Sequence, residues 1–259
     1  MIISIINNKG GVGKTATAVN LGHALAKTKK KVLVVDMDPQ SNSTSILCEE
    51  VPRYSLYEIM DPAETEIQPE SCVAGTRYER LYILPNISET AMLEPLLIAQ
   101  HEQGFYQFRN RFRDYALKNF DIVLIDNPPA LGTLVINALR ASDFVIVPNE
   151  AGSKHSVSGL IKAVNFIEEE RTNGNHDLRF LKLLVTKVDK RLSVHKALIS
   201  QIQDHFPAEK VFETIIPLNT DMQKAELLER SIFEFKSNAS SAVAYKKLAQ
   251  ELIKDIERA

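Results

Sequence analysis

The fold of this chain is decided by one stretch near its N-terminus, Asn8-Lys9-Gly10-Gly11-Val12-Gly13-Lys14-Thr15. The β-branched run before it, residues 2–6, predicts a buried strand, and the apolar spacing of residues 16–25 after it predicts a helix packed on a sheet. A glycine-rich turn between a strand and a helix is the setting of a phosphate-binding loop, where backbone N–H groups and the helix N-terminus surround an anion. The order of these elements therefore predicts a nucleotide-binding α/β protein.

Two side chains of this loop have the chemistry that a bound triphosphate requires. Lys14 can reach the β- and γ-phosphates, and the hydroxyl of Thr15 is placed to bind Mg²⁺. The usual pattern, G-x-x-x-x-G-K-[ST], has glycine where this chain has Asn8, and here a second lysine, Lys9, stands at the start of the loop. We therefore expect a nucleoside triphosphate with Mg²⁺, bound by a loop that departs from the ordinary pattern at Lys9.

Aspartates follow two further runs of hydrophobic residues. Residues 32–36 predict a buried strand that ends in Asp36 and is followed by Asp38, and the next residue, a proline, prevents the strand from continuing. Residues 121–126 match the Walker B pattern, in which the final carboxylate, here Asp126, holds the water shell of Mg²⁺. Because open α/β sheets bind ligands at the carboxyl ends of their strands, we expect these carboxylates beside the phosphate-binding loop.

Strands and helices alternate along the rest of the chain. This alternation predicts an α/β fold of the P-loop NTPase type, a mostly parallel twisted sheet with helices on both faces. The length of 259 residues fits one domain, spanning 1–259, better than two. Further strands are expected at 81–85, 144–148 and 181–186, and a last strand with its exit loop at 211–217. Helices are expected at 54–60, 105–116, 157–170 and 240–257.

One predicted helix carries three arginines, Arg109, Arg111 and Arg113, beside an apolar stripe that includes Phe108 and Phe112. The stripe predicts a helix that faces the core. The arginines then form either a solvated basic side, which we favour, or a surface that faces DNA.

Composition narrows the partners and the compartment. The net charge of −2 gives no overall attraction to nucleic acid or anionic lipid, so binding either would need a local basic patch. No run approaches the length of about 18 apolar residues that a membrane-spanning helix needs, and the first predicted strand leaves no room for a signal peptide. Cys48 and Cys72 are far apart and form no C-x-x-C pair, which argues against a disulfide framework or a zinc site. The sequence therefore predicts a cytosolic protein.

The loop pattern K-G-G-x-G-K-T, residues 9–15, resembles that of the deviant Walker A ATPases, which include ParA partition proteins and MinD. The resemblance implies a weak, partner-stimulated ATPase that cleaves ATP to ADP and phosphate with Mg²⁺. It also implies that Lys9 reaches across an ATP-dependent homodimer to the nucleotide of the partner subunit, so that Lys9 and Lys14 are both catalytic. The nucleotide contacts implied in the loop are Gly10, Gly11, Val12, Gly13, Lys14, Thr15 and Ala16.

Two further phrases resemble the switch segments of this family. The phrase V-D-x-D-P-Q at residues 35–40 resembles the first switch, which implies that Asp38 positions the attacking water and belongs, with Thr15 and Asp126, to the magnesium site. Asp36 is a candidate for orienting Lys14 or the first helix. The phrase D-x-P-P-x-L-G at residues 126–132 resembles the second switch, whose glycine allows the turn to reposition when the γ-phosphate leaves.

The segment after the last predicted strand agrees with the family only in part. In ParA relatives this loop lies over the adenine, so Pro217 and Asn219 are the implied base contacts. Relatives commonly carry DNA-binding arginines just after the proline, whereas this chain has Leu218 and Asp221 there.

A second segment supports DNA binding. Arg191 matches another family arginine implicated in binding DNA, and the cations Lys187 and Lys190 lie close to it in the sequence. We therefore expect these three side chains to contribute to a nonspecific DNA-binding surface, which would make the protein nucleoid-associated.

The resemblance covers nearly the whole chain and implies a ParA-type ATPase. Such a protein forms an ATP-sandwich dimer, binds nonspecific DNA and, with a ParB-like adaptor protein, positions a plasmid, a chromosome or another cargo.

Two other functions compete with this interpretation. A MinD-like membrane-cycling ATPase would end in a basic amphipathic anchor, whereas residues 240–257 carry balanced charges and an apolar stripe that predicts a core helix, without membrane binding. A biosynthetic P-loop enzyme that uses ATP to activate a carboxylate usually lacks the early lysine, so Lys9 argues against it. The nitrogenase iron protein, another member of the group, needs cluster-ligating cysteines, and Cys48 and Cys72 are no suitable set.

Overall fold

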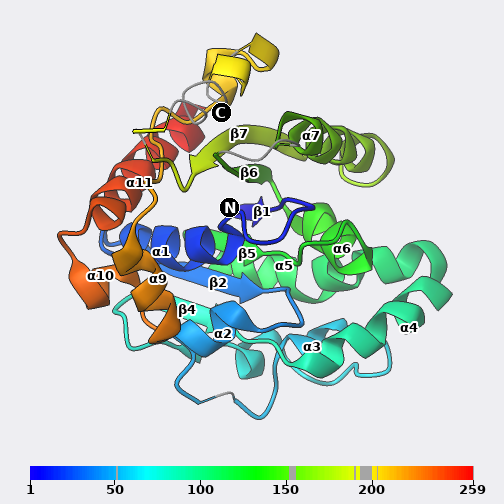
Figure 1. Cartoon of the computed structure of the whole chain (residues 1–259). Helices are drawn as coiled ribbons and strands as arrows, with labels where there is room; N and C mark the ends of the chain where they lie inside the picture. Colours follow the sequence, from blue (N-terminus) through cyan, green and yellow to red (C-terminus); the bar gives the residue numbers. More distant parts are fainter. Residues whose placement is uncertain (51, 152–155, 190, 193–199, 203, 259) are drawn as a thin grey trace.

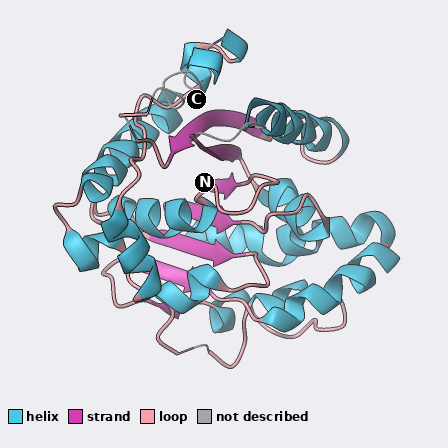
Figure 2. Cartoon of the chain, viewed as in Figure 1, coloured by secondary structure: helices cyan, strands magenta, loops and turns pink. Residues whose placement is uncertain are grey.

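A seven-stranded sheet runs through the computed structural model, in the strand order β3-β4-β2-β5-β1-β6-β7 (Figures 1 and 2). The structure describes residues 1–50, 52–151, 156–189, 191–192, 200–202 and 204–258. Neighbouring strands are parallel except at one edge, where β3 is antiparallel to β4. The strands are Ile2–Ile5 (β1), Val32–Asp36 (β2), Ala74–Gly75 (β3), Leu81–Leu84 (β4), Ile122–Asp126 (β5), Phe144–Glu150 (β6) and Arg179–Thr186 (β7).

Helices cover both faces of the sheet, which confirms the predicted α/β class (Figure 1). One face is covered by Lys14–Ala26 (α1), Asn42–Leu47 (α2), Thr220–Leu227 (α9), Ile232–Lys236 (α10) and Ser240–Arg258 (α11). The other is covered by Leu56–Met60 (α3), Glu94–Ala99 (α4), Gln107–Asn119 (α5), Thr133–Ala141 (α6) and Ser156–Asn173 (α7). Short 3₁₀ turns occupy Pro69–Cys72, Ser88–Leu93, His101–Tyr106 and Ala208–Lys210.

Alternate residues of the central strands enter the cores on opposite faces. In β2, Val32 and Val34 pack on the side of α1, whereas Leu33 and Val35 pack on the side of α5. Both faces therefore bury apolar side chains, which explains why these strands read as unbroken hydrophobic runs. Across the described residues, no helix combines the length and the apolarity needed to cross a lipid bilayer.

The register of the central strands places the site. β2 and β5 pair in parallel with Asp36 opposite Asp126, and β1 pairs with β5 so that Ile5 is also opposite Asp126. The phosphate-binding loop follows β1 directly, so the two carboxylates and the loop meet at the same edge of the sheet.

Residues 211–217 run beside β7 but form no regular strand, and the sequence prediction was wrong on this point. Isolated parallel bridges join Val211 to Leu183 of β7 and Pro217 to Val188, just after β7. The N–H groups of Phe212 and Ile216 also donate to the carbonyl oxygens of Leu183 and Val185, both at 2.9 Å. Between them the Glu251 carboxylate of α11 accepts hydrogen bonds from the N–H groups of Glu213 and Thr214, at 2.8 and 3.0 Å. Because these two N–H groups donate to α11 and not to carbonyl oxygens of β7, a continuous ladder of hydrogen bonds with β7 cannot form.

The arginines of α5 are not a solvated basic side. Arg109 donates to the carbonyl oxygen of Arg140 at 2.7 Å, and Arg111 donates to the carbonyl oxygens of Glu64 and Ile67. Each guanidinium is half-buried and satisfies main-chain acceptors at loop and helix ends. Arg113 likewise donates to the carbonyl oxygen of Ala141 and to the carboxylate of Asp143.

Candidate nucleotide-binding site

The glycine-rich loop has the backbone curvature that a phosphate-binding loop needs. Gly11 and Gly13 have φ angles of 75° and 91°, in the left-handed region that side chains disfavour. Helix α1 begins at the next residue, Lys14, so its N-terminal N–H groups open toward the loop. From β7, the hydroxyl of Thr186 donates to the carbonyl oxygen of Val12 at 2.8 Å and holds the loop against the sheet.

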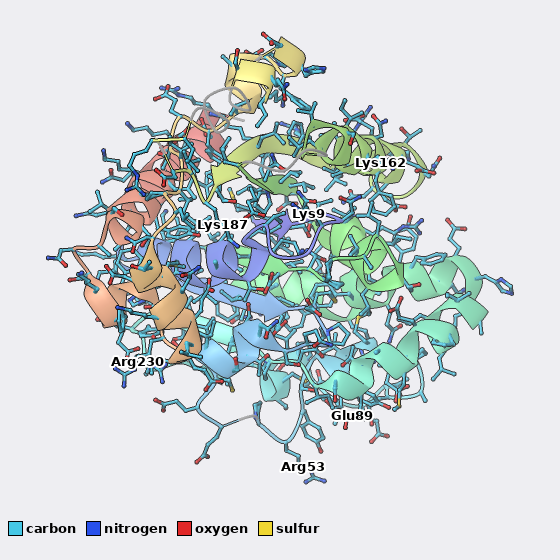
Figure 3. The ribbon with its side chains drawn as sticks, in the orientation of Figure 1. Lys9, Arg53, Glu89, Lys162, Lys187 and Arg230 are labelled. Carbon is cyan, nitrogen blue, oxygen red and sulfur yellow. The ribbon has the colours of Figure 1, made fainter. Side chains whose placement is uncertain are left out.

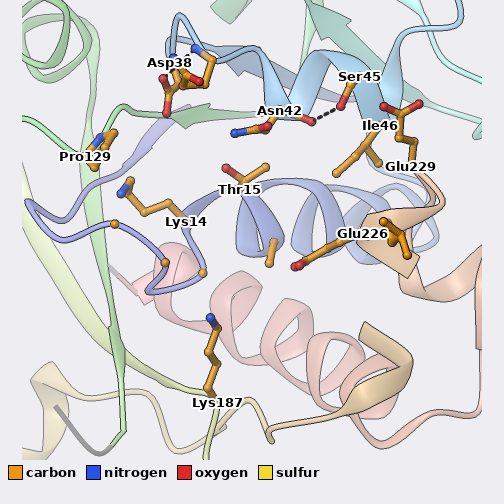
Figure 4. Close-up of a pocket in the computed structure, with 16 residues that line it drawn as sticks. Lys14, Thr15, Asp38, Asn42, Ser45, Ile46, Pro129, Lys187, Glu226 and Glu229 are labelled. Atoms are coloured by element: carbon orange, nitrogen blue, oxygen red, sulfur yellow. Dashed lines mark hydrogen bonds between the residues drawn. The ribbon is translucent and has the colours of Figure 1, made fainter. Parts of the chain in front are cut away.

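A pocket of about 590 Å³ opens beside this loop (Figure 4). One end is formed by the loop itself with Asp38 and Pro129, and the other by the ends of α2 and α9, where Ile46 and Leu227 lie beside Glu226 and Glu229. The lining residues are Gly10, Gly11, Gly13, Lys14, Thr15, Ala16, Asp38, Gln40, Asn42, Ser45, Ile46, Pro129, Lys187, Glu226, Leu227 and Glu229.

Lys14 is preorganised within the pocket. Its side chain is buried, and the ammonium donates to the carbonyl oxygen of Lys9 at 3.2 Å. Desolvation lowers the pKa of Lys14, and the nearby carboxylates of Asp126 and Asp38 oppose that shift. A partly desolvated ammonium gains more from an arriving phosphate than a fully hydrated one would.

Two buried aspartates stand at the strand ends behind Lys14. Asp36 accepts hydrogen bonds from the N–H and the hydroxyl of Thr44, both at 2.7 Å, so it fixes helix α2. Asp126 accepts from the Ser43 hydroxyl at 2.7 Å, while its other carboxylate oxygen is buried without a hydrogen-bond partner. Burial raises the pKa of both carboxyl groups above the ordinary range.

The surroundings of Asp126 fit a magnesium ion. A buried carboxylate oxygen without a partner suits a cation or its bound water. The Thr15 side chain lies close enough to the same carboxyl group to lower its pKa, against the effect of burial. A cation there would also remove the electrostatic cost of two neighbouring buried carboxylates.

Asp38 lies across the pocket from Thr15 and on the same side as Pro129 of the second switch (Figure 4). Its carboxylate accepts the N–H of Gln40 at 3.0 Å, and its own N–H donates to Asp36 at 3.2 Å. Of the two carboxylates in this segment, Asp38 therefore lines the pocket, whereas Asp36 is buried and hydrogen-bonded to Thr44 of α2.

Lys9 lies outside the pocket that contains Lys14. Its ammonium is 3.6 Å from the carboxylate of Glu150, and its side chain is 46% exposed. It lines a smaller hollow with Asn8, Asn149 and Lys162, among others. Figure 3 labels Lys9 and Lys162 on the ribbon. The two lysines of this loop therefore line different cavities: Lys14 lines the larger pocket and Lys9 the smaller hollow.

The structure divides the remaining candidate residues. Lys187, expected at a DNA surface, lines the nucleotide pocket (Figure 4). Pro217 lines another hollow with Val188 and Ser240, and Asn219 caps α9 by accepting the N–H of Asp221, so neither belongs to the lining of the nucleotide pocket.

The predicted DNA-binding segment is described in part. Arg191 is 89% exposed and forms a two-point ion pair with Asp189, at 2.7 and 2.9 Å. Lys190 lies outside the described residues. Asp221, at a position where relatives carry arginine, pairs with Lys236 at 2.9 Å.

Sequence reasoning missed the far end of the pocket. Ile46 comes from α2, Glu226 and Leu227 come from the end of α9, and Glu229 follows α9, so these residues are distant in the sequence. No local pattern marks them, because α2 and α9 come together only when both pack on the face of the sheet that α1 covers.

Comparison with known proteins agrees with this geometry. A family model described as an AAA domain matches residues 1–180. The chain is 34% identical over 259 residues to the chromosome-partitioning ATPase Soj of Thermus thermophilus, covering 99% of this chain and 97% of that protein. It is 31% identical over 258 residues to the chromosome partitioning protein ParA of Myxococcus xanthus, covering 98% and 88%.

Solved structures share the fold over nearly the whole chain. Cobyrinic acid a,c-diamide synthase from Mycobacterium smegmatis, solved with ADP and magnesium, has a TM-score of 0.83 at 26% identity and covers 99% of this chain and 95% of that one. Apo McdA from Cyanothece has a TM-score of 0.84 at 23% identity, covering 97% and 98%, and shows the fold alone. The deviant loop, the two switches and the extent of these matches lead to one assignment: the chain belongs to the ParA/Soj family of P-loop ATPases.

Proposed function

We propose that this ATPase binds ATP with Mg²⁺, closes into an ATP-sandwich dimer, binds nonspecific DNA in that state and positions a cargo with a ParB-like adaptor. The single observation that carries the proposal is the placement of Lys9. The chain supplies its own pocket with Lys14, while the exposed ammonium of Lys9 lines a different hollow and is available to a nucleotide in a second subunit.

Hydrolysis in this proposal is phosphoryl transfer to water. Lys14 of one subunit and Lys9 of the other stabilise charge on the β- and γ-oxygens, with the loop N–H groups. Asp38 orients the attacking water. Mg²⁺, held at Thr15 and near Asp126, would neutralise phosphate charge when bound. We expect turnover to be slow, because a positioning protein must keep its ATP state long enough to use it.

Two features support the partition role. Curated relatives that match over almost the full chain carry chromosome-partitioning names. In addition, Arg191 presents an exposed guanidinium, and a dimer would present it twice. Lys187 lines the nucleotide pocket, so we assign it to nucleotide binding before DNA binding.

The test uses the unmodified chain with ATP, ADP or no nucleotide. Light scattering should report a dimer with ATP and a monomer in the other two samples. Binding to random-sequence duplex DNA should require ATP and weaken steeply with salt. A chain that stays monomeric with ATP would refute the proposed sandwich dimer. An ATP-bound dimer that does not bind DNA even at low salt would refute the proposed DNA binding.

A biosynthetic function is the second candidate, because the structure resembles cobyrinic acid a,c-diamide synthase at 26% identity. A screen for metabolites that stimulate ATP hydrolysis separates the two functions. A MinD-like membrane cycle has less support, since Tyr245, Leu248 and Leu252 of α11 are buried in the core. Liposome flotation with ATP tests it.

A further inference from the structure

The segment 91–99, which completes the 3₁₀ turn Ser88–Leu93 and forms α4, presents an apolar face to solvent on the outside of the molecule (Figure 1). Met92, Leu96 and Ile98 are 73%, 53% and 54% exposed. The other exposed positions of the segment are two alanines and a proline, and its only charged residue is Glu94. Surface helices carry polar side chains on their outward face, so an outward face without them marks a surface that another molecule covers.

The packing of α4 keeps this face outward. Leu93 and Leu97, on its inward side, are buried in the core beneath the helix. A Cβ on Gly104 would lie 1.9 Å from the carbonyl oxygen of Leu97, so only glycine lets the following turn pack this closely on the helix. Met92 and Leu96 therefore cannot turn inward, because the space under the helix is already filled.

Both switch segments touch this part of the chain. The Thr90 hydroxyl donates to the side-chain oxygen of Asn86 at 2.6 Å, and the N–H of Asn86 donates to the hydroxyl of Thr44 at 2.9 Å. Thr44 belongs to α2, the helix that follows the first switch. On the other side, the Glu94 carboxylate lies 3.3 Å from the position that a Cβ on Gly132 of the second switch would occupy. The apolar face is therefore coupled to both segments that flank the phosphate end of the pocket.

A second copy of this chain suits this face. The segment follows β4 and contacts the turn after β5, so it lies at the carboxyl edge of the sheet, as Lys9 does. A partner subunit that receives Lys9 must approach this edge. An uncharged face can also meet its own copy across a two-fold axis without repulsion between like charges.

The size of the face is consistent with part of a dimer interface. Its three large side chains expose on the order of 300 Å² of apolar surface, whereas a standard interface buries about 800 Å² on each partner. The face therefore supplies a substantial share of an interface, and the loop that carries Lys9 would supply more.

We propose that the apolar face of residues 91–99 is a contact surface of the ATP-bound dimer, on which a second copy of the chain packs. This inference rests on the proposed sandwich dimer and adds an apolar contact to it. A shift of either switch when the γ-phosphate leaves moves the face, so the contact belongs to the ATP state and weakens after hydrolysis.

The first experiment measures dimerisation of the full chain by light scattering with a nonhydrolysable ATP analogue. Met92→Lys and Leu96→Lys should each raise the Kd of the dimer at least tenfold, because the interface would have to bury an unpaired ammonium. The affinity of each monomeric variant for the analogue should stay within about twofold of wild type. Leu117→Lys is the matched control: Leu117 is 38% exposed in the last turn of α5, at the amino edge of the sheet, and this variant should dimerise like wild type.

A second measurement needs no substitution. Peroxide oxidises exposed methionine to the sulfoxide, and mass spectrometry of digested protein gives the rate for Met92. With the ATP analogue, Met92 should be oxidised at least fivefold more slowly than with ADP, and dilution below the Kd of the dimer should abolish the protection.

Three results would overturn the inference. The first is a wild-type Kd of the dimer in both lysine variants, and the second is oxidation of Met92 at the same rate in dimer and monomer. The third is loss of analogue binding by the monomeric variants, which would place the effect in the nucleotide site. A wild-type chain that stays monomeric with the analogue would instead refute the proposed sandwich dimer itself.

Discussion

The ammonium of Lys9 lies 3.6 Å from the carboxylate of Glu150, at the end of β6, while the ammonium of Lys14 donates to the backbone carbonyl of Lys9 itself at 3.2 Å. Both lysines belong to one loop, yet only Lys14 lines the nucleotide pocket. The ion pair of Lys9 is solvent-exposed, so it contributes little stability and can be exchanged for another anion.

Replacing Lys9 should separate nucleotide binding from assembly. We expect Lys9→Ala to bind ATP as a monomer with nearly wild-type affinity but to lose hydrolysis, because its own pocket keeps Lys14. Light scattering with ATP and a phosphate-release assay measure the two effects. Lys162→Ala, which removes another lysine from the same hollow, is the matched control. Normal hydrolysis by Lys9→Ala would exclude a role in the partner's site.

Replacing residues of the pocket itself should affect binding directly. Lys14→Ala should abolish ATP binding, since several phosphate charges then lack a counter-charge. Thr15→Ala should weaken binding only when Mg²⁺ is present. Calorimetric titration with ATP, with and without Mg²⁺, distinguishes these effects, and Lys27→Ala at the exposed end of α1 is the control. Wild-type affinity in Lys14→Ala would contradict the assignment of the loop.

Asp38→Ala should bind ATP and retain it. Because the attacking water is no longer oriented, we expect hydrolysis to fall by about 10²-fold or more and the ATP dimer to persist. Size-exclusion chromatography after incubation with ATP detects the dimer, and Asp114→Ala on the exposed side of α5 serves as the control. Rapid turnover by Asp38→Ala would assign the positioning of water to another residue.

His23 should make the stability of the fold depend on pH. Burial lowers the pKa of His23 to about 4, and its Nδ1 is 2.7 Å from the Ser231 hydroxyl. Unfolded histidine has a pKa of about 6.5 and binds more protons in the window between these values. Protonation of His23 should therefore leave the free energy of unfolding unchanged above about pH 7 and lower it by roughly 2 kcal/mol between pH 7.5 and pH 5.

Denaturant unfolding at several pH values measures this contribution as the difference between wild type and His23→Gln. The difference should shrink as the pH falls toward 5, because acid removes the advantage that wild type has at neutral pH. His176→Gln, at an exposed histidine, is the matched control for the substitution. Parallel curves for wild type and His23→Gln would contradict the shifted pKa.

Arg191→Ala should weaken DNA binding equally for all sequences. If an ATP dimer neutralises roughly five phosphates, log affinity should fall with log salt at a slope of about −4.5, and the variant should have a shallower slope. Fluorescence anisotropy with random duplex DNA gives both quantities. Arg171→Ala is the matched control, since Arg171 is also exposed and paired with a nearby carboxylate. An unchanged slope would remove Arg191 from the DNA-binding surface.

The sequence by itself determined the strand, the loop and the helix at the phosphate end of the site. Local forces fix these features: glycine at positions 11 and 13 permits positive φ angles, and apolar runs buried on both faces are typical of parallel central strands. Because parallel strands end at the same edge of the sheet, the sequence also placed Asp36 and Asp126 beside the loop, and their register confirms this.

Tertiary structure alone decided the rest of the site. The N–H groups of Glu213 and Thr214 donate to the carboxylate of Glu251, which prevents a regular strand at 211–217. No local pattern could predict this contact, because Glu251 lies 38 and 37 positions further along the chain. Other features of the site also depend on contacts between distant segments. Lys9 pairs with Glu150, and Ile46 and Leu227 line the same pocket. Arg77 donates a hydrogen bond to the carbonyl oxygen of Ile46. Such contacts form only when the helices pack on the sheet. Their free energy comes from the burial of apolar surface and from well-oriented hydrogen bonds, and neither can be read from the spacing of residues along the chain.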